Sequence, residues 1–130
     1  MKFNVKILTP ERELYSGEAD MVVIPSAQGD IGVLARHAPL IAKLRVGIIK
    51  IKSGDGERLV ATTGGIAEVS DNNMALLLDV AEFKEEIDVE RAKAAKERAE
   101  KRLNSNKQDI DFSRAQAALD RAINRMKIVK

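Results

Sequence analysis

The hydrophobic residues of this 130-residue chain change their spacing at Ala81–Ala92 (AEFKEEIDVERA), and this change constrains the fold more than any other feature. Upstream, apolar residues alternate with a period of two, which is typical of strands; the clearest run is Met74, Leu76, Leu78 and Val80. Downstream, they recur at helical spacing, at Val89, Ala92, Ala99 and Leu103. Asp88 stands where a helix N-cap is expected. The junction is therefore predicted to be a hinge between a sheet and helices.

The residues before the junction form a series of short apolar runs separated by turn residues. Predicted strands are Met1–Leu8, Met21–Ile24, Leu40–Leu44, Val46–Lys52, Leu59–Thr63, Ile66–Val69 and Met74–Val80. Ser53–Gly56 (SGDG) is a strong signal for a hairpin turn. The two glycines of Gln28–Gly32 predict a tight turn or bulge that exposes Asp30. Short strands at regular spacing indicate an antiparallel β-sandwich or a flattened barrel and not a parallel sheet.

The residues after the junction fit two helices. The second, from Asp111 to about Val129, carries apolar residues at steps of three and four, and the polar connector Asn104–Asp109 is short enough for an antiparallel hairpin. The first helix offers mainly alanines, which contribute little on burial, so we expect it to give the hairpin a weak, reversible contact with the sandwich. The predicted domains are residues 1–83, the β-sandwich, and residues 84–130, the helical hairpin.

The composition excludes several functional classes. The charge balance of 22 basic and 20 acidic residues gives a net charge of +2, and aromatic residues are scarce, so nucleic-acid binding is not indicated. The chain has no cysteine and a single histidine, His37, which argues against a thiolate, zinc or histidine-based catalytic site. No phosphate-binding glycine loop is present. Because no nucleophile, base and orienting group converge, an enzyme is not expected, and neither is a metal or a required cofactor.

One set of charged residues suggests a ligand. Arginines repeat at spacings of seven and four on each helix, which aligns them on one face: Arg91, Arg98 and Arg102, then Arg114, Arg121 and Arg125. Together with Glu82 and Asp88, such stripes would suit a polyphosphate and a ribose. The same stripes also fit a solvent-exposed face with ion pairs, such as Glu97 with Lys101. The pattern alone leaves both interpretations open.

Four segments in register resemble the epsilon subunit of F-type ATP synthases, in its bacilli-like form. They are GDIGVLARHAPLIAKL (Gly29–Leu44), TTGGIAEV (Thr62–Val69), IDVERA (Ile87–Ala92) and DIDFSRAQAALDRAINR (Asp109–Arg125). The resemblance implies a ten-stranded sandwich that binds the gamma subunit and the polar loops of the membrane c-ring. It also implies two helices that either fold on the sandwich or extend along gamma to the catalytic head, with its beta subunits, and block ATP hydrolysis.

The resemblance also implies roles for individual residues. Ile87, Asp88, Arg91 and Ala92 match the nucleotide-sensing motif of the family, and its companions match Glu82, Arg114, Arg121 and Arg125. These eight residues are the expected ATP site, with ATP as a regulatory ligand. Asp30 and its neighbour Ile31 match the turn that faces the c-ring loops. The residues expected near gamma are His37, Pro39 and Leu40.

The resulting hypothesis is a non-catalytic rotor subunit of the central stalk whose helices inhibit hydrolysis and whose hairpin is held down by ATP. The alternative is a stand-alone nucleotide-sensing module with the sandwich as its scaffold. Since Phe3, Val5 and Ile7 already alternate as a strand, we expect no signal or transit peptide. The expected location is the cytoplasmic face of a bacterial membrane, reached only through the complex. The choice between protons and sodium as the coupling ion stays open.

Overall fold

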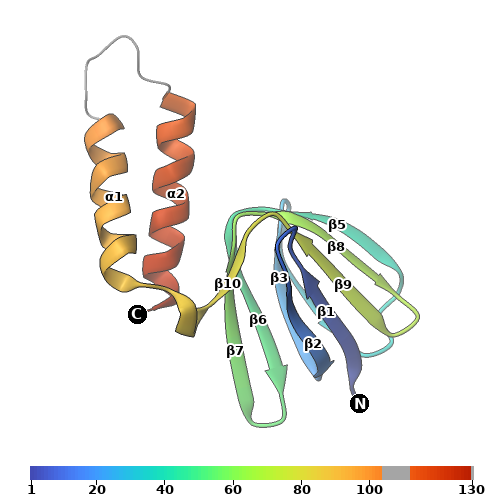
Figure 1. Ribbon diagram of the computed structural model, residues 1–130. Helices are drawn as coiled ribbons and strands as arrows, with labels where there is room; N and C mark the ends of the chain where they lie inside the picture. Colours follow the sequence, from blue (N-terminus) through green and yellow to red (C-terminus); the bar gives the residue numbers. More distant parts are fainter. Residues whose placement is uncertain (104–111, 130) are drawn as a thin grey trace.

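The computed structural model of the chain describes residues 1–103 and 112–129, and consists of a β-sandwich with two helices at one end (Figure 1). The sandwich confirms the predicted fold class. Its strands are β1 (Phe3–Leu8), β2 (Glu13–Ala19), β3 (Met21–Ser26), β4 (Gly29–Leu34), β5 (Leu40–Leu44), β6 (Gly47–Ser53), β7 (Gly56–Thr62), β8 (Gly65–Ser70), β9 (Asn73–Leu78) and β10 (Ala81–Phe83). A short 3-10 helix, η1 (Lys84–Glu86), precedes the helices α1 (Val89–Leu103) and α2 (Phe112–Ile128).

The ten strands hydrogen-bond in one continuous order, β10-β7-β6-β3-β5-β8-β9-β1-β2, with β4 attached to β3. The sheet curls so that its two halves face each other (Figure 1). The prediction of an antiparallel sandwich holds for every strand pair except one, because β1 and β9 run parallel. This parallel pair joins strands that lie almost 70 residues apart in the chain, as the pairing of Asn4 with Asn73 shows.

The sandwich core contains the apolar residues that alternate along the strands. In β1, Phe3, Val5 and Ile7 are buried while Asn4 and Lys6 are exposed, as is Lys2 just before the strand, which is what the period of two predicts. The buried cluster also includes Val22, Ile24, Val33, Leu44, Ile49, Ile51, Val60, Val69, Met74, Leu76, Leu78 and Phe83. Among the residues whose burial is described, every buried member of this cluster lies between Phe3 and Phe83, and none comes from the helices.

The two predicted turns have different outcomes. The SGDG hairpin is confirmed, because Gly54 and Asp55 form a two-residue turn between β6 and β7, with φ +61° at Gly54. The predicted turn at Gln28–Gly32 is wrong. The chain already turns at Ala27 and Gln28, and Asp30 lies on strand β4 opposite Pro25. Apolar residues at Ile31 and Val33 support the strand despite the glycines beside them.

The predicted strand Met74–Val80 and the hinge after it are also placed differently. Strand β9 ends at Leu78, and Val80 lies in a bend with 47% of its surface exposed. The chain then re-enters the sheet as β10, where Ala81, Glu82 and Phe83 pair with Thr62, Ala61 and Val60 of β7. The first three residues of the proposed hinge stretch therefore belong to the sandwich.

The two helices form an antiparallel hairpin, in agreement with the prediction (Figure 1). Asp88 is the N-cap of α1, as expected, because its Oδ1 accepts a hydrogen bond from the backbone N–H of Arg91 at 3.1 Å. The predicted connector Asn104–Asp109 and the predicted start of the second helix at Asp111 lie outside the described residues.

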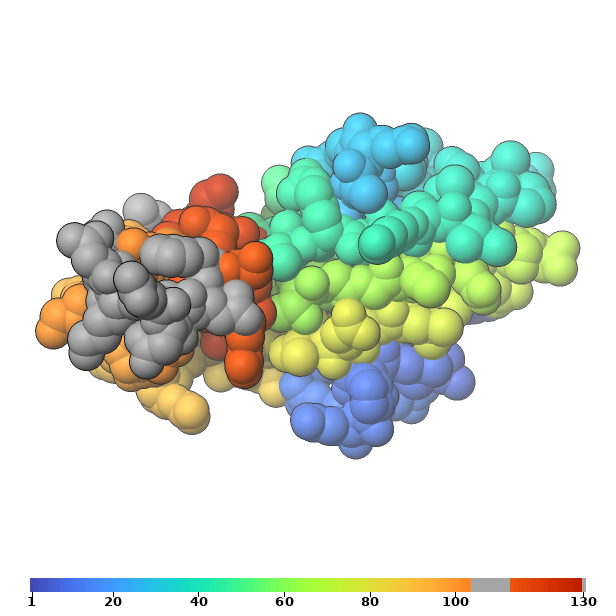
Figure 2. Space-filling view, turned by 90° about the horizontal axis from the view of Figure 1, so that it is seen from above, coloured from blue at the N-terminus to red at the C-terminus, as the bar shows by residue number. Residues whose placement is uncertain are grey.

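The alanines do not make the contact with the sandwich, which corrects the expectation of an alanine-rich docking face. Helix α1 packs mainly on α2, and the buried alanines of this pair are Ala92, Ala99, Ala115 and Ala122. Helix α2 lies between α1 and the sandwich (Figure 2) and contacts β6 and β7. Where the hairpin meets the sandwich, the apolar contact is made mostly by larger side chains. We call it the second apolar cluster, and it consists of Ile48, Leu59, Ile87, Met126, Ile128 and Val129 with the alanines Ala61 and Ala92. Burial of each large side chain contributes roughly 1.5–3 kcal/mol, so the docked hairpin is held more firmly than alanines alone would hold it.

Candidate functional site

A cavity of about 240 Å³ lies at the base of the helical hairpin, where both helices meet the linker from the sandwich. Six of the eight residues predicted to bind ATP line it: Glu82, Ile87, Asp88, Arg91, Ala92 and Arg125. Three further residues complete the lining, namely Glu86, Ala95 and Arg98. The sheet edge, α1 and α2 each supply part of the cavity, so it exists only while the hairpin is docked.

The wall between the sandwich and α2 is an ion pair. Glu82 extends from β10 and its Oε1 contacts Nε of Arg125 on α2. Both side chains are partly buried, which strengthens their attraction relative to an exposed pair. Arg125 makes no other hydrogen bond within the described residues, so its two Nη groups remain as donors. Glu82 therefore orients Arg125 while leaving the fork of the guanidinium for a ligand.

The IDVERA motif provides the opposite wall. Ile87 and Ala92 are buried in the second apolar cluster, and they fix the start of α1 against Ala61 and Ile128. Asp88 caps α1, so its carboxylate already accepts a hydrogen bond from the backbone N–H of Arg91. The side chain of Arg91 is exposed at the cavity and has no hydrogen-bond or ion-pair partner within the described residues.

The two remaining predicted residues lie outside this cavity. Arg121 lines a small neighbouring crevice together with Glu82, Asn124 and Arg125, one turn away from the main site. Arg114 lies eleven residues before Arg125 on α2, which corresponds to about 16 Å along the helix axis. The structure therefore brings Arg121 near the site and keeps Arg114 away from it. Arg98 lines the cavity as well; it belongs to the predicted stripe of the first helix, with Arg91 and Arg102, but was not assigned to the site.

The ionisable groups of the cavity suit an anionic ligand with hydroxyl groups. Three arginines, Arg91, Arg98 and Arg125, line the cavity together with three carboxylates, Glu82, Glu86 and Asp88. Of the three carboxylates, Glu86 accepts hydrogen bonds from Arg12. The pKa of Glu86 lies below its ordinary value, first because the Phe83 N–H donates to it and then because of Arg12, with burial acting in the opposite direction. Guanidinium groups match phosphate oxygens, and carboxylates accept from ribose hydroxyls or a base amine.

A buried contact that the sequence did not reveal holds α2 to the sandwich. The side-chain amide of Asn124 donates to the carbonyl oxygen of Gly47 at 2.7 Å. Asn124 occupies a position of α2 between the apolar residues Ala122 and Met126, and nothing in the helical pattern distinguishes it from a surface residue. Its burial depends on how α2 meets β6, which sequence spacing does not report.

The residues predicted to contact partner subunits lie on and after β4. Asp30 is exposed and forms an ion pair with Arg45, Oδ1 to Nη2 at 2.9 Å. Ile31 and Leu40 are only partly exposed, because each packs on the sandwich core. His37 and Pro39 lie in the loop between β4 and β5, where His37 Nδ1 is 2.7 Å from the Ala38 carbonyl oxygen. The structure thus leaves Asp30 available to a partner and partly covers Ile31 and Leu40.

A second exposed surface was not predicted. Ile41, Ile66 and Leu77 lie on the outer face of β5, β8 and β9 with 75%, 46% and 44% of their surfaces exposed. Ile66 and Leu77 are directly opposite, and Ile41 pairs with Glu68, two residues along β8 on the same face. We call these three residues the outer apolar patch. A signal was present in the sequence, since Ile41 shares its strand face with Lys43, which is exposed.

Two features are absent from residues 1–103 and 112–129. No helix there combines the length and apolar character that crossing a membrane requires. No group of three or more histidine, aspartate or glutamate side chains in the same residues is arranged to hold a metal ion.

Comparison with protein families matches the whole chain. Residues 2–84 match the family described as ATP synthase, Delta/Epsilon chain, beta-sandwich domain, and residues 85–130 match the corresponding long alpha-helix domain. The ATP synthase epsilon chain of Desulforamulus reducens is 50% identical over 121 residues, covering 93% of this chain and 92% of the relative. That of Caldicellulosiruptor saccharolyticus is 42% identical over 129 residues, covering 99% and 94%.

Solved structures share the fold at lower sequence identity. A chain of the Euglena gracilis mitochondrial ATP synthase, solved with OSCP, F1 and the c-ring, superposes with a TM-score of 0.87 at 21% identity, covering 99% of this chain and 82% of that one. A chain from the central stalk and c-ring of the Tetrahymena thermophila enzyme gives 0.65 at 19% identity, covering 100% and 98%. The family matches and the identities to bacterial relatives show that the chain belongs to the ATP synthase delta/epsilon family, as one of its epsilon chains, which are non-catalytic subunits of the central stalk.

Proposed function

We propose that this chain couples the catalytic head of an F-type ATP synthase to its membrane c-ring, restrains ATP hydrolysis through its helical hairpin, and senses ATP. The observation that carries the sensing role is the cavity at the hairpin base, where Arg91, Arg98 and Arg125 gather around a site shared by sandwich and helices. Its cations suit the phosphates of ATP, and Glu82 and Asp88 suit the ribose or base.

The shared lining makes binding and docking interdependent. Arg91 and Arg98 belong to α1, Arg125 belongs to α2, and Glu82 belongs to the sandwich. A ligand that contacts all of them binds the docked hairpin and loses most of its contacts when the hairpin leaves. Such a ligand stabilises the docked state by RT ln(1 + [L]/Kd), which is about 2.7 kcal/mol at a hundredfold excess over Kd.

The strength of the docking contact suits a switch of this kind. The second apolar cluster and two polar contacts, Asn124 with Gly47 and Arg125 with Glu82, hold α2 to the sandwich. This is a small interface compared with the core, and the sandwich core does not depend on it. At low ATP the hairpin would leave, extend toward the catalytic head and stop hydrolysis; at high ATP it would stay docked.

Two surfaces of the sandwich suit the partners of a stalk subunit. The outer apolar patch of Ile41, Ile66 and Leu77 is available to a protein surface such as that of the gamma subunit. Asp30, on the exposed end of β4, suits the polar loops of the c-ring, as its match to the family turn implies. The membrane association that follows is peripheral and occurs through the complex, at the cytoplasmic face of a bacterial membrane.

The alternative is a stand-alone nucleotide-sensing module. It is favoured by one observation, because the candidate site is built entirely from one chain and needs no partner subunit. The two functions differ in where the protein is found. A stalk subunit co-purifies with membranes in a complex with gamma, whereas a stand-alone sensor stays in the soluble fraction.

Calorimetric titration of the full chain with ATP tests the sensing role. We expect one site, weakened roughly 10- to 100-fold in the Arg91→Ala and Arg125→Ala variants, since each removes a charged hydrogen bond of about 1.5–3 kcal/mol. Lys93→Ala is the matched control, because Lys93 is an exposed cation on α1 that does not line the cavity. Its affinity should equal that of the unmodified chain.

The possible results separate the two parts of the proposal. Absence of binding at millimolar ATP would remove the sensing role and leave the stalk role in place. Equal weakening by Lys93→Ala and Arg91→Ala would point to non-specific attraction by a basic helix and would also contradict the site. Failure to recover gamma with this chain from membranes would contradict the stalk role while leaving ATP binding intact.

A further inference from the structure

The linker between sandwich and helical hairpin is anchored along most of its length. Strand β10 pairs with β7, and the Phe83 ring is buried in the sandwich core, where its edge meets Tyr15 at 6.4 Å between ring centroids. The residues that follow, Lys84–Glu86, form η1 and end with a hydrogen bond from the Ile87 N–H to the Lys84 carbonyl oxygen. Only Ile87 and Asp88 then separate η1 from α1.

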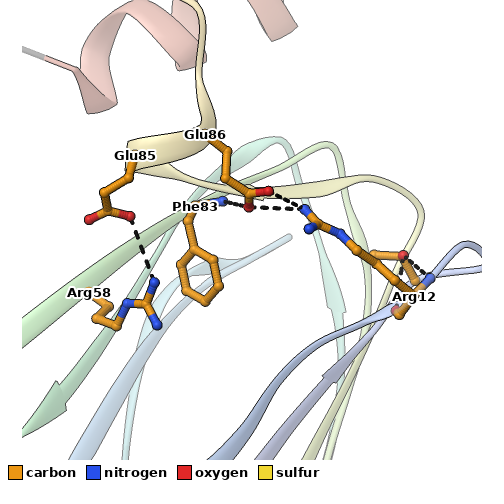
Figure 3. A network of polar contacts seen from close by, with 6 residues as sticks. Arg12, Arg58, Phe83, Glu85 and Glu86 are labelled. Atoms are coloured by element: carbon orange, nitrogen blue, oxygen red, sulfur yellow. Dashed lines mark hydrogen bonds and ion pairs between the residues drawn. The ribbon is translucent and has the colours of Figure 1, made fainter.

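Glu86 links η1 to the loop between β1 and β2, which lies at the other end of the strand order from β10 (Figure 3). Its carboxylate oxygens accept from Nη2 of Arg12 at 2.9 and 2.8 Å, and Oε1 also accepts from the Phe83 N–H at 2.9 Å. Arg12 lies between β1 and β2, 74 residues away in the chain. Its backbone is fixed in a tight turn, because the Arg12 N–H donates to Thr9 Oγ1 and the Thr9 N–H donates to the Arg12 carbonyl oxygen.

A second arginine supports the same segment from β7. The Arg58 guanidinium lies 3.6 Å from the centre of the Phe83 ring, and its Nη2 is 3.8 Å from Glu85 (Figure 3). A guanidinium over an aromatic face is attractive. Arg12 and Arg58 are the cations that face Glu86, and both favour its ionised form. Surface ion pairs contribute little on average, but here one carboxylate combines an arginine and a backbone donor in good geometry.

We propose that the Arg12–Glu86 contact is a clamp that makes the linker up to Glu86 part of the sandwich and confines the pivot of the helical hairpin to Ile87 and Asp88. This rests on the proposed movement of the hairpin. The clamp also positions one wall of the candidate ATP site, because Glu86 and Glu82 line the cavity from the side that does not move.

The consequence concerns the path of the hairpin. A pivot at two residues lets α1 swing as a rigid body from a fixed point, whereas a free linker over 81–88 would let the hairpin search a wide volume. Ile87 marks the boundary, since it is buried against Ala61 on one side and against Ala92 and Ile128 of the hairpin on the other. When the hairpin leaves the sandwich, Ile87 loses its contacts with Ala92 and Ile128 but keeps its contact with Ala61.

Amide hydrogen exchange on the full chain, without nucleotide or partner subunits, tests the clamp. The probes are the Phe83 and Ile87 N–H groups, whose acceptors belong to the clamped segment. Arg12→Ala should speed their exchange roughly tenfold, the change expected for the loss of about 1.4 kcal/mol. In Arg12→Lys the two exchange rates should lie between those of the unmodified chain and of Arg12→Ala, because lysine keeps the positive charge but lacks the planar guanidinium group. The matched control, Arg45→Ala, breaks another exposed arginine ion pair and should change neither probe.

The position of the pivot is tested by releasing the hairpin. The Asn124→Ala, Arg125→Ala double variant removes both polar docking contacts, so amides of α1 and α2 should exchange faster while Phe83 stays protected. Unchanged exchange of Phe83 and Ile87 in Arg12→Ala would overturn the clamp, and so would loss of Phe83 protection in the released variant with Arg12 intact. Because ATP is absent throughout, neither result depends on whether the chain binds nucleotide.

Discussion

The side-chain amide of Asn124 on α2 donates to the backbone carbonyl oxygen of Gly47 at the start of β6, at 2.7 Å and buried from solvent. It is one of the contacts that hold α2 on the sandwich, together with the Arg125–Glu82 ion pair and the second apolar cluster. Gly47 itself has little room, since a Cβ there would come within 2.6 Å of Pro25 Cβ. Gly47 is buried, so its carbonyl oxygen needs a donor within the protein, and Asn124 supplies one.

Replacing Asn124 with alanine should loosen the docked hairpin without unfolding the sandwich. The substitution leaves a buried carbonyl without its donor, which costs about 1–3 kcal/mol. Trypsin should then cleave within α1 and α2 at least several-fold faster, since their lysines and arginines become accessible on undocking. Gln116→Ala is the control, because Gln116 is exposed on α2 and bonds only with Asp120 in the described residues. Equal cleavage of the two variants would show that Asn124 does not hold the hairpin.

Glu86 should give the sandwich a specific dependence on pH. Its pKa in the folded chain lies below the ordinary value of about 4.5, so the folded state favours the ionised form. The stabilisation is therefore complete above the ordinary pKa and is lost as the pH falls through the lowered one. In Glu86→Gln the free energy of unfolding should decline less steeply over this acid range, as measured by urea unfolding at a series of pH values. Parallel declines in the two proteins would contradict the assignment.

Asp30→Lys should weaken coupling between hydrolysis and ion pumping while leaving the fold intact. The carboxylate is exposed on β4, and among the described residues its one ion-pair partner is Arg45, so the change in stability should be within about 0.5 kcal/mol, plus a small repulsion from Arg45. Pumping would be measured in membrane vesicles beside the rate of hydrolysis. Asp30→Asn separates charge from shape, and it should have an intermediate effect. Normal coupling in Asp30→Lys would remove this residue from the proposed c-ring contact.

The strands were predictable where one face is buried, because the period of two is then strict. Phe3, Val5 and Ile7 illustrate this. The N-cap of α1 at Asp88 was predictable for a different reason, because a capping signal depends only on neighbouring residues. The prediction failed where a backbone pairing overrides local turn residues. Gly29 and Gly32 suggested a turn, but pairing with β3 holds both in a strand, and pairing with β7 extends the sheet to Phe83.

The candidate site was predictable in part, because a motif of neighbouring residues marks one side of it. Glu82, Asp88, Arg91 and Arg125 meet in one cavity, as the motif implied. Arg114 does not line the cavity because it lies about 16 Å along the helix axis from Arg125, near the other end of α2. Arg98 does line it, two turns after Arg91 on α1. Which arginines of the two stripes come together depends on how α1 pairs with α2, and that pairing involves residues far apart in the chain, which the spacing within one helix does not report.

Deleting residues 88–130 should speed ATP hydrolysis by the assembled complex if the hairpin is the brake. The sandwich surfaces proposed to bind gamma and the c-ring lie wholly before Phe83, so assembly should be unaffected. Hydrolysis would be measured at several ATP concentrations, with subunit content checked in each preparation. The largest acceleration is expected at low ATP, where the hairpin is undocked in the intact chain. Equal rates at every concentration, with normal assembly, would show that the hairpin does not restrain this enzyme.

Two truncated chains should show where the sandwich ends as a folding unit. A chain that ends at Phe83 contains every buried residue of the main core, so it should unfold cooperatively with β-type circular dichroism. A chain that ends at Ile87 also keeps Glu86 with its contacts to Arg12 and the Phe83 N–H. It should therefore melt at a higher temperature, by roughly 4–8 °C for each kcal/mol that these contacts contribute.

A third chain, ending at Ile87 and carrying Glu86→Gln, assigns that difference. If the clamp is responsible, the substitution should lower the melting temperature toward that of the chain ending at Phe83, because glutamine keeps an acceptor for the Phe83 N–H but loses the ionic contact with Arg12. Identical melting of the longer chain with and without the substitution would assign the gain to Ile87, whose side chain covers Ala61. An insoluble or molten product from the Phe83 chain would instead show that the sandwich needs η1 to fold.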